Sequence, residues 1–281
     1  MDKIPYPYIA LDNRMFSSTQ DLIYFASDNN YSAIDYSFHS NSQKLSDLDK
    51  DIKSIECILK SNIKLRYHCP FSKIEFAHSN REFANDSFLL IKKCIEIASH
   101  FNGEYLTAHI GLGFKKERDL SYQGAINNLS KLVEYGNKKN VRICLENMTT
   151  GWTNNPYSLL SLIKKTGASI TFDLGHANSS SWINNNGKTS LEFLKSVSKY
   201  IVNAHVYEVE KIDNETSRSY HVAPENLNIL QPLLGELIKA KCDWWAIELK
   251  DQGETNHTRS LLQSFLSKIN PIKNISQQYS N

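Results

Sequence analysis

Residues 142–178 read RICLENMTTGWTNNPYSLLSLIKKTGASITFDLGHAN. A short apolar run ends in Glu146, an amphipathic stretch follows between Pro156 and Gly167, and a second apolar run ends in Asp173. Apolar residues at helical spacing predict a helix in the middle, because Pro is common where helices begin and Gly where they end. A strand, a helix and a second strand in this order form a parallel βαβ unit.

The same alternation continues in both directions along the chain. Apolar runs that predict strands lie at Tyr8–Leu11, Ser32–Ser37, Lys64–His68, Tyr105–His109, Arg142–Glu146, Ile170–Asp173, Ile201–His205 and Trp244–Glu248. Helical patterns lie between them, for example at 87–101, 122–139, 156–167, 189–200 and 227–241. Eight strands alternating with helices predict an α/β fold, a single (β/α)₈ TIM barrel over residues 1–281. An open doubly wound sheet is the alternative, although no GxGxxG follows the first run.

Composition excludes several classes of protein. The net charge of +2 gives no general attraction to nucleic acid or to an anionic membrane. The five cysteines are scattered without a CxxC, so we expect neither a disulfide framework nor a thiolate zinc site. No signal-peptide pattern opens the chain, and no apolar stretch approaches ~18 residues. We therefore expect a cytoplasmic location and a tail that frays from about residue 271, while homo-oligomer formation stays open.

Ionisable side chains end six consecutive runs. They are His68, His109, Glu146, Asp173 with His176 shortly after it, His205 and Glu248. The carboxyl ends of barrel strands share one rim, where barrel enzymes place their chemistry. Strand alternation puts Glu146 on one face with Cys144, and Glu248 on one face with Ala246, which leaves the bulky aliphatic residues for the helix layer.

A metal site explains this set better than separate structural roles do. Singly, a His at a strand end is typical of a hydrogen-bonded structural residue, and an Asp or Glu is typical of a helix cap. Several carboxylates buried on one rim are very unfavourable unless cations neutralise them. The mixture of imidazole and carboxylate suits Zn²⁺, Mn²⁺, Fe²⁺ or Co²⁺.

Loop residues add further candidates. His221, in the loop after the seventh run, is a candidate ligand, although alone it is typical of a solvated His. Phe71, Trp152 and Trp182 lie in the predicted rim loops, where aromatic rings either cover the core or stack on a sugar or base. Asn-rich loops follow the fifth and sixth runs and suit a small-molecule substrate with hydroxyl groups.

The ordered motifs HxP, H, EN, DxGH, H, H and E resemble the xylose-isomerase-like superfamily, which contains sugar isomerases, epimerases and endonuclease IV. The resemblance spans essentially the whole chain, and ICLENM, FDLGHAN and AIELK are its most specific segments. For the isomerase and epimerase branch, it implies one divalent metal held by Glu146, Asp173, His205 and Glu248. It also implies that Glu146 and Glu248 move protons between adjacent carbons, and that His176 contacts the substrate.

For the endonuclease branch, the same resemblance implies three zinc ions. His68 and His109 correspond to ligands of the first ion, and Glu146 bridges it to the second. His176 and His221 correspond to ligands of the third ion. Ser219 stands where that ion normally has an Asp, and the glycine-rich stretch after the last His is missing. These departures argue against binding of the third ion and against a role in DNA repair.

Four functions remain open, with one to three ions. The first is a metal-dependent isomerase or epimerase of a sugar or related polyhydroxy carbonyl compound, favoured because its four-residue core is intact. The second is a multinuclear phosphoester hydrolase, which His68, His109 and His221 would serve. The third is an iron-dependent modifying enzyme of a biosynthetic pathway. The fourth is a barrel that has lost catalysis and binds a partner.

Overall fold

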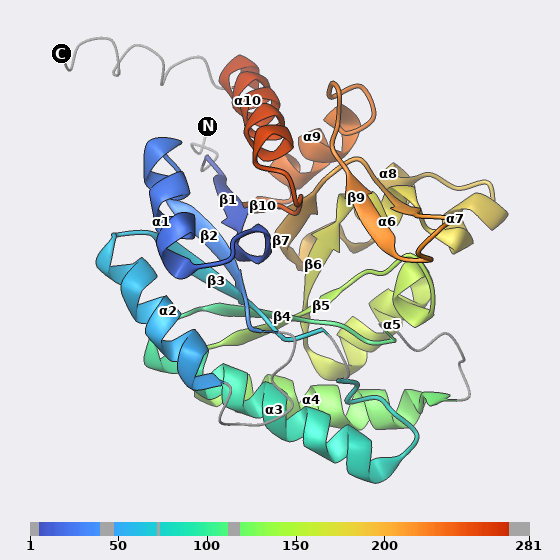
Figure 1. Ribbon diagram of the computed structural model, residues 1–281. Helices are drawn as coiled ribbons and strands as arrows, with labels where there is room; N and C mark the ends of the chain where they lie inside the picture. Colours follow the sequence, from blue (N-terminus) through green and yellow to red (C-terminus); the bar gives the residue numbers. More distant parts are fainter. Residues whose placement is uncertain (1–5, 40–47, 72–73, 112–118, 270–281) are drawn as a thin grey trace.

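Strands and helices alternate along the chain in the computed structural model, which describes residues 6–39, 48–71, 74–111 and 119–269 (Figure 1). The tail predicted to fray from about residue 271 lies outside these ranges. The barrel strands are β1 (Tyr8–Asp12), β2 (Ala33–Ser37), β3 (Lys64–His68), β4 (Tyr105–Ala108), β5 (Arg142–Glu146), β6 (Ser169–Asp173), β7 (Ile201–Val206) and β10 (Trp244–Ile247). Each predicted run overlaps one of them.

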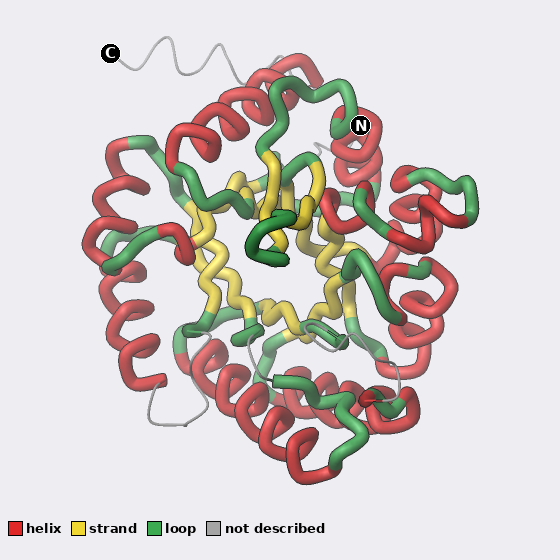
Figure 2. The backbone as a smooth tube through the Cα atoms, turned by 45° about the vertical axis from the view of Figure 1, so that its right-hand side comes forward, coloured by secondary structure: helices red, strands yellow, loops and turns green. Residues whose placement is uncertain are grey.

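These strands pair in parallel and close into a ring in the order β1-β10-β7-β6-β5-β4-β3-β2, so the first and last strands are neighbours. Figure 2 shows the ring surrounded by helices. The predicted (β/α)₈ TIM barrel is confirmed, and the open doubly wound alternative is wrong because the sheet has no free edge.

Helices of very different length follow the strands. They are α1 (Thr19–Asp28), α2 (Leu48–Lys60), α3 (Arg81–His100), α4 (Tyr122–Lys138), α5 (Pro156–Thr166), α6 (Leu174–Asn178), α7 (Ser181–Asn185), α8 (Ser190–Val197), α9 (Gln231–Lys239) and α10 (Gln252–Ile269). The predicted signals at α5 are confirmed. Asn155 caps the helix by accepting from the Tyr157 N–H at 2.9 Å, and Gly167 ends it with a φ of 76°.

Alternation along β10 separates two apolar regions. Trp245 and Ile247 belong to the large core of buried side chains that includes the helices' inner faces. Trp244 and Ala246 belong to a small cluster with Ala10 and others inside the ring. Burial of each large apolar side chain stabilises the fold by about 1.5–3 kcal/mol. The next inward-facing position is Glu248, because side chains alternate every two residues along the strand. Its carboxylate therefore lies at the mouth of the barrel.

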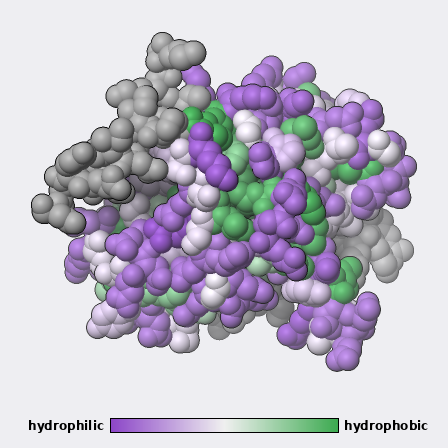
Figure 3. Space-filling model, turned by 90° about the horizontal axis from the view of Figure 1, so that it is seen from above, coloured by the Kyte–Doolittle hydropathy of each residue, from purple (hydrophilic) through white to green (hydrophobic). Residues whose placement is uncertain are grey.

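An antiparallel hairpin interrupts the repeat after β7, and the sequence did not predict it. Its strands are β8 (Val209–Ile212) and β9 (Ser219–Val222). Within the described ranges, no helix has the length and apolar content needed to cross a membrane. Figure 3 shows a mostly hydrophilic surface, with apolar residues gathered near the middle of that view.

Candidate metal centre

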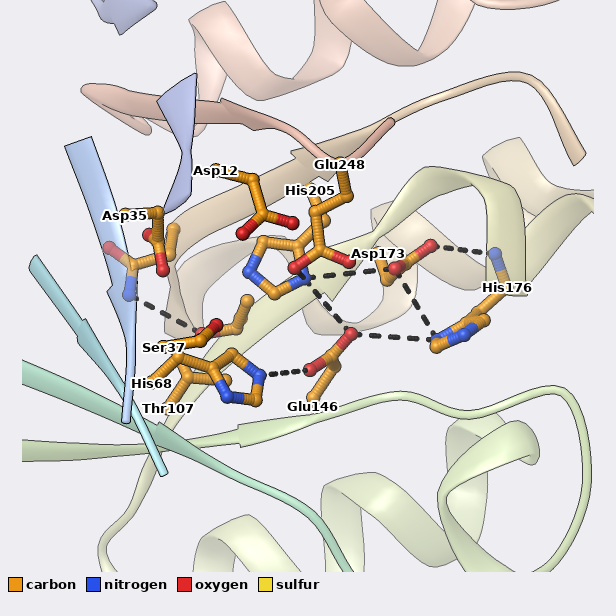
Figure 4. Close-up of polar contacts among 12 residues, drawn as sticks. Asp12, Asp35, Ser37, His68, Thr107, Glu146, Asp173, His176, His205 and Glu248 are labelled. Atoms are coloured by element: carbon orange, nitrogen blue, oxygen red, sulfur yellow. Dashed lines mark hydrogen bonds and ion pairs between the residues drawn. The ribbon is translucent and has the colours of Figure 1, made fainter. Parts of the chain in front are cut away.

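Four side chains from neighbouring strands converge at the carboxyl-terminal mouth of the barrel (Figure 4). This core cluster consists of Glu146 at the end of β5, Asp173 at the end of β6, His205 in β7 and Glu248 directly after β10. Register holds them together, because Asp173 is paired with His205, which is paired with Ala246 on its other side. All four are at most 5% exposed.

Three carboxylates surround one imidazole nitrogen. His205 Nδ1 lies 3.0 Å from Glu146 Oε1, 3.3 Å from Glu248 Oε1 and 3.7 Å from Asp173 Oδ2. A single ring nitrogen can share at most one proton with these oxygens. The core cluster therefore carries a surplus of negative charge around the point where its donor atoms meet.

The pKa values in the core cluster follow from this crowding. Burial alone would raise the pKa of Glu146, but His205 and His109 outweigh it and hold that pKa well below its usual range. Glu248 behaves in the same way, because Arg14 and His205 lower its pKa against the effect of burial. For Asp173, burial is the larger effect and its pKa is raised. At neutral pH the two glutamates are thus held as carboxylates.

Two further histidines lie against the other oxygen of Glu146. His68 Nε2 is 3.2 Å from Glu146 Oε2, and His109 Nε2 is 2.6 Å from the same atom. His68 donates its Nδ1 proton to the Cys69 carbonyl at 2.8 Å, so neutral His68 turns a lone pair toward the carboxylate. Burial lowers the pKa of His109, although Glu146 raises it. Two lone pairs facing each other repel unless a proton or a cation lies between them.

The donor set fits a divalent metal ion. Among the described residues, the buried Asp173 Oδ2 and His205 Nε2 have no hydrogen-bond partner, a condition that costs about 1–3 kcal/mol per group. Donor atoms come within 4.8 Å of one another in the groups His68–Glu146–His205, Asp173–His205–Glu248 and Glu146–Asp173–His176. Nitrogen and oxygen donors in this mixture suit Zn²⁺, Mn²⁺, Fe²⁺ or Co²⁺.

Sequence reasoning missed two residues beside the core cluster. Arg14 lies in the short turn after β1 and contacts Glu248 Oε2 at 2.9 Å. It also contacts Asp12 Oδ2 at 2.6 Å, and Asp12 accepts from the Arg14 backbone N–H at 2.8 Å. The first predicted run ended one residue before Asp12. Asp12 lies two residues after the inward-facing Ala10, so strand alternation could have placed it inside the ring.

His176 and His221 form the outer part of the centre, together with a carboxylate that the sequence did not point to. His176, in α6, lies 3.4 Å from Asp173 Oδ2 and 3.5 Å from Glu146 Oε1. His221, in β9, lies 3.8 Å from Glu248 Oε2. The new member is Glu210 in β8, whose Oε2 is 3.8 Å from His176 Nε2. His176, Glu210 and His221 form a fourth group whose donor atoms lie within 4.8 Å of one another.

A cavity of about 790 Å³ opens beside these residues. Its walls include His68, His109, Glu146, His176, His221 and Glu248. Asn13, Ser17 and Ser37 add neutral hydrogen-bonding groups. The space is large enough for a small polar molecule in contact with the core cluster.

The three predicted substrate-contacting aromatics lie in different places. Phe71 lines the cavity, with the Arg14 guanidinium 5.5 Å from its ring centroid. Trp152 packs edge-on against Tyr122, with ring centroids 5.1 Å apart. Trp182 packs edge-on against Tyr157 at 5.8 Å. Their contact with substrate stays a prediction.

Comparison with known proteins gives the family. The model of the xylose isomerase-like TIM barrel family matches residues 23–266. The chain belongs to this family. An uncharacterized protein of Methanocaldococcus jannaschii is 32% identical over 210 residues, which cover 74% of this chain and 83% of the relative. The resemblance drawn from the ordered motifs is therefore confirmed.

Solved structures share the barrel at low sequence identity. A D-tagatose 3-epimerase-like protein matches with a TM-score of 0.74 and 21% identity, covering 94% of this chain and 98% of that one. The IOLI protein, solved with a bound zinc atom, matches with a TM-score of 0.68 and 14% identity, covering 92% and 99%. At these identities the likeness is one of fold.

Proposed function

We propose that the chain is a divalent-metal-dependent isomerase or epimerase of a sugar or a related polyhydroxy carbonyl compound. One observation carries the proposal: two ionised carboxylates, Glu146 at the end of β5 and Glu248 directly after β10, approach the same His205 nitrogen and both border the cavity. A pair of this kind suits proton transfer at adjacent carbons. Membership of a xylose isomerase-like family and the fold shared with an epimerase-like protein agree with it.

The core cluster fits the metal such a reaction needs. Glu146, Asp173, His205 and Glu248 would hold the ion. Once bound, it would polarise a substrate carbonyl and its neighbouring hydroxyl group, and so acidify the proton to be moved.

The protein's own groups then divide the remaining work. Glu146 and Glu248 are held in the form that accepts a proton, since both have lowered pKa values. Arg14 fixes one oxygen of Glu248 and leaves Oε1 facing His205. The neutral side chains of Asn13, Ser17 and Ser37 line the cavity and would orient substrate hydroxyls. No oxidising cofactor is required.

The test is exchange of a substrate proton with solvent. Ketoses and aldoses, free and phosphorylated, are incubated in D₂O with the metal-loaded protein, and deuterium incorporation and product formation are followed by NMR. We expect Glu146→Gln and Glu248→Gln each to lose about 10²–10⁴-fold in rate, the range for removal of a general acid or base. Glu134→Gln, at an exposed position of α4, is the matched control and should retain full activity.

Retained activity in both core variants would contradict the proton-transfer roles. Failure of a fully metal-loaded protein to exchange a proton with any member of the panel would contradict the substrate class.

A multinuclear phosphoester hydrolase is the second candidate, and a specific observation favours it. His68 and His109 both face Glu146 Oε2, while His205 faces Glu146 Oε1, so this carboxylate could bridge two ions. Two ions on either side of one carboxylate suit attack on a phosphodiester. Cleavage of bis(p-nitrophenyl) phosphate or of abasic DNA with Zn²⁺ or Mn²⁺, lost in His109→Asn, would favour this function over isomerisation.

A further inference from the structure

Three side chains outside the core cluster meet at the edge of the cavity. They are His176 from α6, Glu210 from β8 and His221 from β9. One donor atom of each lies within 4.8 Å of the other two. His176 is 5% exposed, and the side chains of Glu210 and His221 are 15% and 21% exposed. The group is therefore partly buried and still open to the cavity.

The register of the hairpin brings two of these residues together. Glu210 is paired directly with His221 across the antiparallel strands. Directly opposed residues of such a pair point to the same face. The hairpin is tied to α6, because the Glu210 N–H donates to Ser179 Oγ at 2.8 Å and Asn178 Nδ2 donates to the Glu208 carbonyl at 2.7 Å. His176 and the Glu210–His221 pair are thus held against each other.

Both histidines are fixed in the tautomer of a metal ligand. His176 Nδ1 donates to the Asn147 carbonyl at 2.9 Å, and His221 Nδ1 donates to the Glu248 carbonyl at 2.7 Å. A carbonyl oxygen can only accept, so in each neutral ring the Nε2 atom carries the free lone pair. Histidines that bind metals almost always donate the other ring N–H in this way.

The ring of His221 is also held in place. Tyr207 stacks on it with a centroid distance of 3.8 Å and an interplanar angle of 3°. Gly175, between Asp173 and His176, makes room for Tyr207, since a Cβ atom there would lie 1.9 Å from the tyrosine ring. A rigid surrounding of this kind is what a ligand set with fixed geometry requires.

We infer that His176, Glu210 and His221 form a divalent-cation site beside the core cluster, in which Glu210 supplies the carboxylate that is missing at Ser219. Ser219 lies two residues before His221, where the family resemblance implied an Asp. Glu210 lies on the opposite strand of the same hairpin, and its side chain is on the same face of the hairpin as that of His221. Two imidazoles and one carboxylate, with an open position toward the cavity, suit Zn²⁺. Among the described residues, Glu210 and His221 belong to no other group of candidate ligands, so the site extends beyond the proposed function.

Counting the bound zinc ions tests the inference. Metal-free protein is titrated with Zn²⁺ against a chromophoric chelator, and ions bound per chain are compared in wild type, Glu210→Gln and Glu215→Gln. Glu215 lies in the turn of the same hairpin, is exposed, and serves as the matched control. We expect Glu210→Gln to bind one ion fewer than wild type and Glu215→Gln to bind the same number. Equal stoichiometry and affinity in wild type and Glu210→Gln overturn the inference.

Two further measurements keep the test decisive. Thermal unfolding of the metal-free variants shows whether Glu210→Gln is folded, and His221→Asn, which leaves Glu210 in place, should lose the same single ion. Co²⁺ titration followed by its visible absorption should show one spectral component missing in both variants. Asp173→Asn should instead weaken the core site, so failure of the site at the hairpin and failure of the proposed function are distinguishable.

Discussion

The interior of the barrel contains two polar layers that are equally buried and differently balanced. The closed layer, below the mouth, consists of Arg66, Thr107, Thr171 and Asn203. Thr107 Oγ1 is 2.7 Å from Thr171 Oγ1, which also accepts from Asn203 Nδ2 at 3.3 Å. Arg66 donates to Asn203 Oδ1, to the Val202 carbonyl at 2.9 Å and to Asp243 at 2.8 Å. Its one positive charge meets one carboxylate.

The core cluster lies two residues further along the strands, toward the mouth of the barrel. Its charges are not balanced in this way. Three carboxylates lie around one imidazole nitrogen, and Arg14 forms an ion pair with only one of them, Glu248. Burial is therefore not what distinguishes the two layers. The difference is whether the protein's own groups complete the hydrogen bonds and the charge. Four substitutions break or sharpen this contrast.

The largest expected effect is on the closed layer. Arg66→Met should lower the free energy of unfolding by about 3–4 kcal/mol, because it leaves the buried Asn203 Oδ1 without its donor and removes the cation from its aromatic contacts. The guanidinium lies 3.9 Å from the centroid of the Tyr105 ring. Urea denaturation of metal-free protein measures the loss, and Arg142→Met, at an exposed position, is the control. An unchanged midpoint, or a lost metal ion, would contradict the structural role of this layer.

Asp173→Asn should affect metal binding and not the stability of the metal-free protein, the reverse of the effect expected for Arg66→Met. We expect the affinity of the core cluster for metal to fall about 100-fold, equivalent to about 2.7 kcal/mol. The metal-free variant should be as stable as wild type or more so, because a buried carboxylate with an unpartnered oxygen has been neutralised. Competition titration and urea denaturation in chelator give the two values. Asp35→Asn is the control, since Asp35 is buried but accepts from Trp244 Nε1 at 2.8 Å.

Glu75 sharpens the contrast, because it is a buried carboxylate outside the ligand groups. Burial raises its pKa to about 7 from 4.5, although N–H groups of Ala77 and Gly111 act against this. Between these pH values the folded state holds a proton that the unfolded state has released. The free energy of unfolding should therefore fall by about 3 kcal/mol as pH rises through this window, and level off above it.

Glu75→Gln should lack this component. The difference in unfolding free energy between wild type and variant, measured by denaturation from pH 4 to 8 in the presence of chelator, gives the slope directly. A difference that stays constant with pH would show that Glu75 does not titrate in this window.

The smallest effect is expected for Thr107→Val. The substitution removes one hydroxyl from the closed layer and leaves Thr171 with Asn203 as its partner. A loss of about 1 kcal/mol is expected, with unchanged metal affinity. A change in metal affinity would show that the two layers are coupled.

Much of the fold followed from the sequence, because burial on both faces gives the barrel strands continuous apolar runs. Lys64–His68 and Arg142–Glu146 were predicted with their observed bounds. Alternation also placed Glu146 and Glu248 inside the ring. The core cluster could be found because each member ends a recognisable run.

The hairpin and Arg14 could not be found in this way. The residues of β8 and β9 are partly or fully exposed, so their sequence carries no apolar pattern. Glu210 acquires its meaning only from its pairing with His221, which depends on the length of the turn. Arg14 reaches Glu248 only because the first and last strands are neighbours in the closed ring.

The pairing of β1 with β10 bears on the order in which the site is completed during folding. The Arg14–Glu248 contact spans the seam between β1 and β10, so one carboxylate of the core cluster takes its place only when the two ends of the repeat meet. A chain emerging from the ribosome holds every other member of the cluster before this strand arrives. If the core cluster holds an ion as proposed, its full affinity for metal requires a closed ring, and metal titration would report that the last strand has docked.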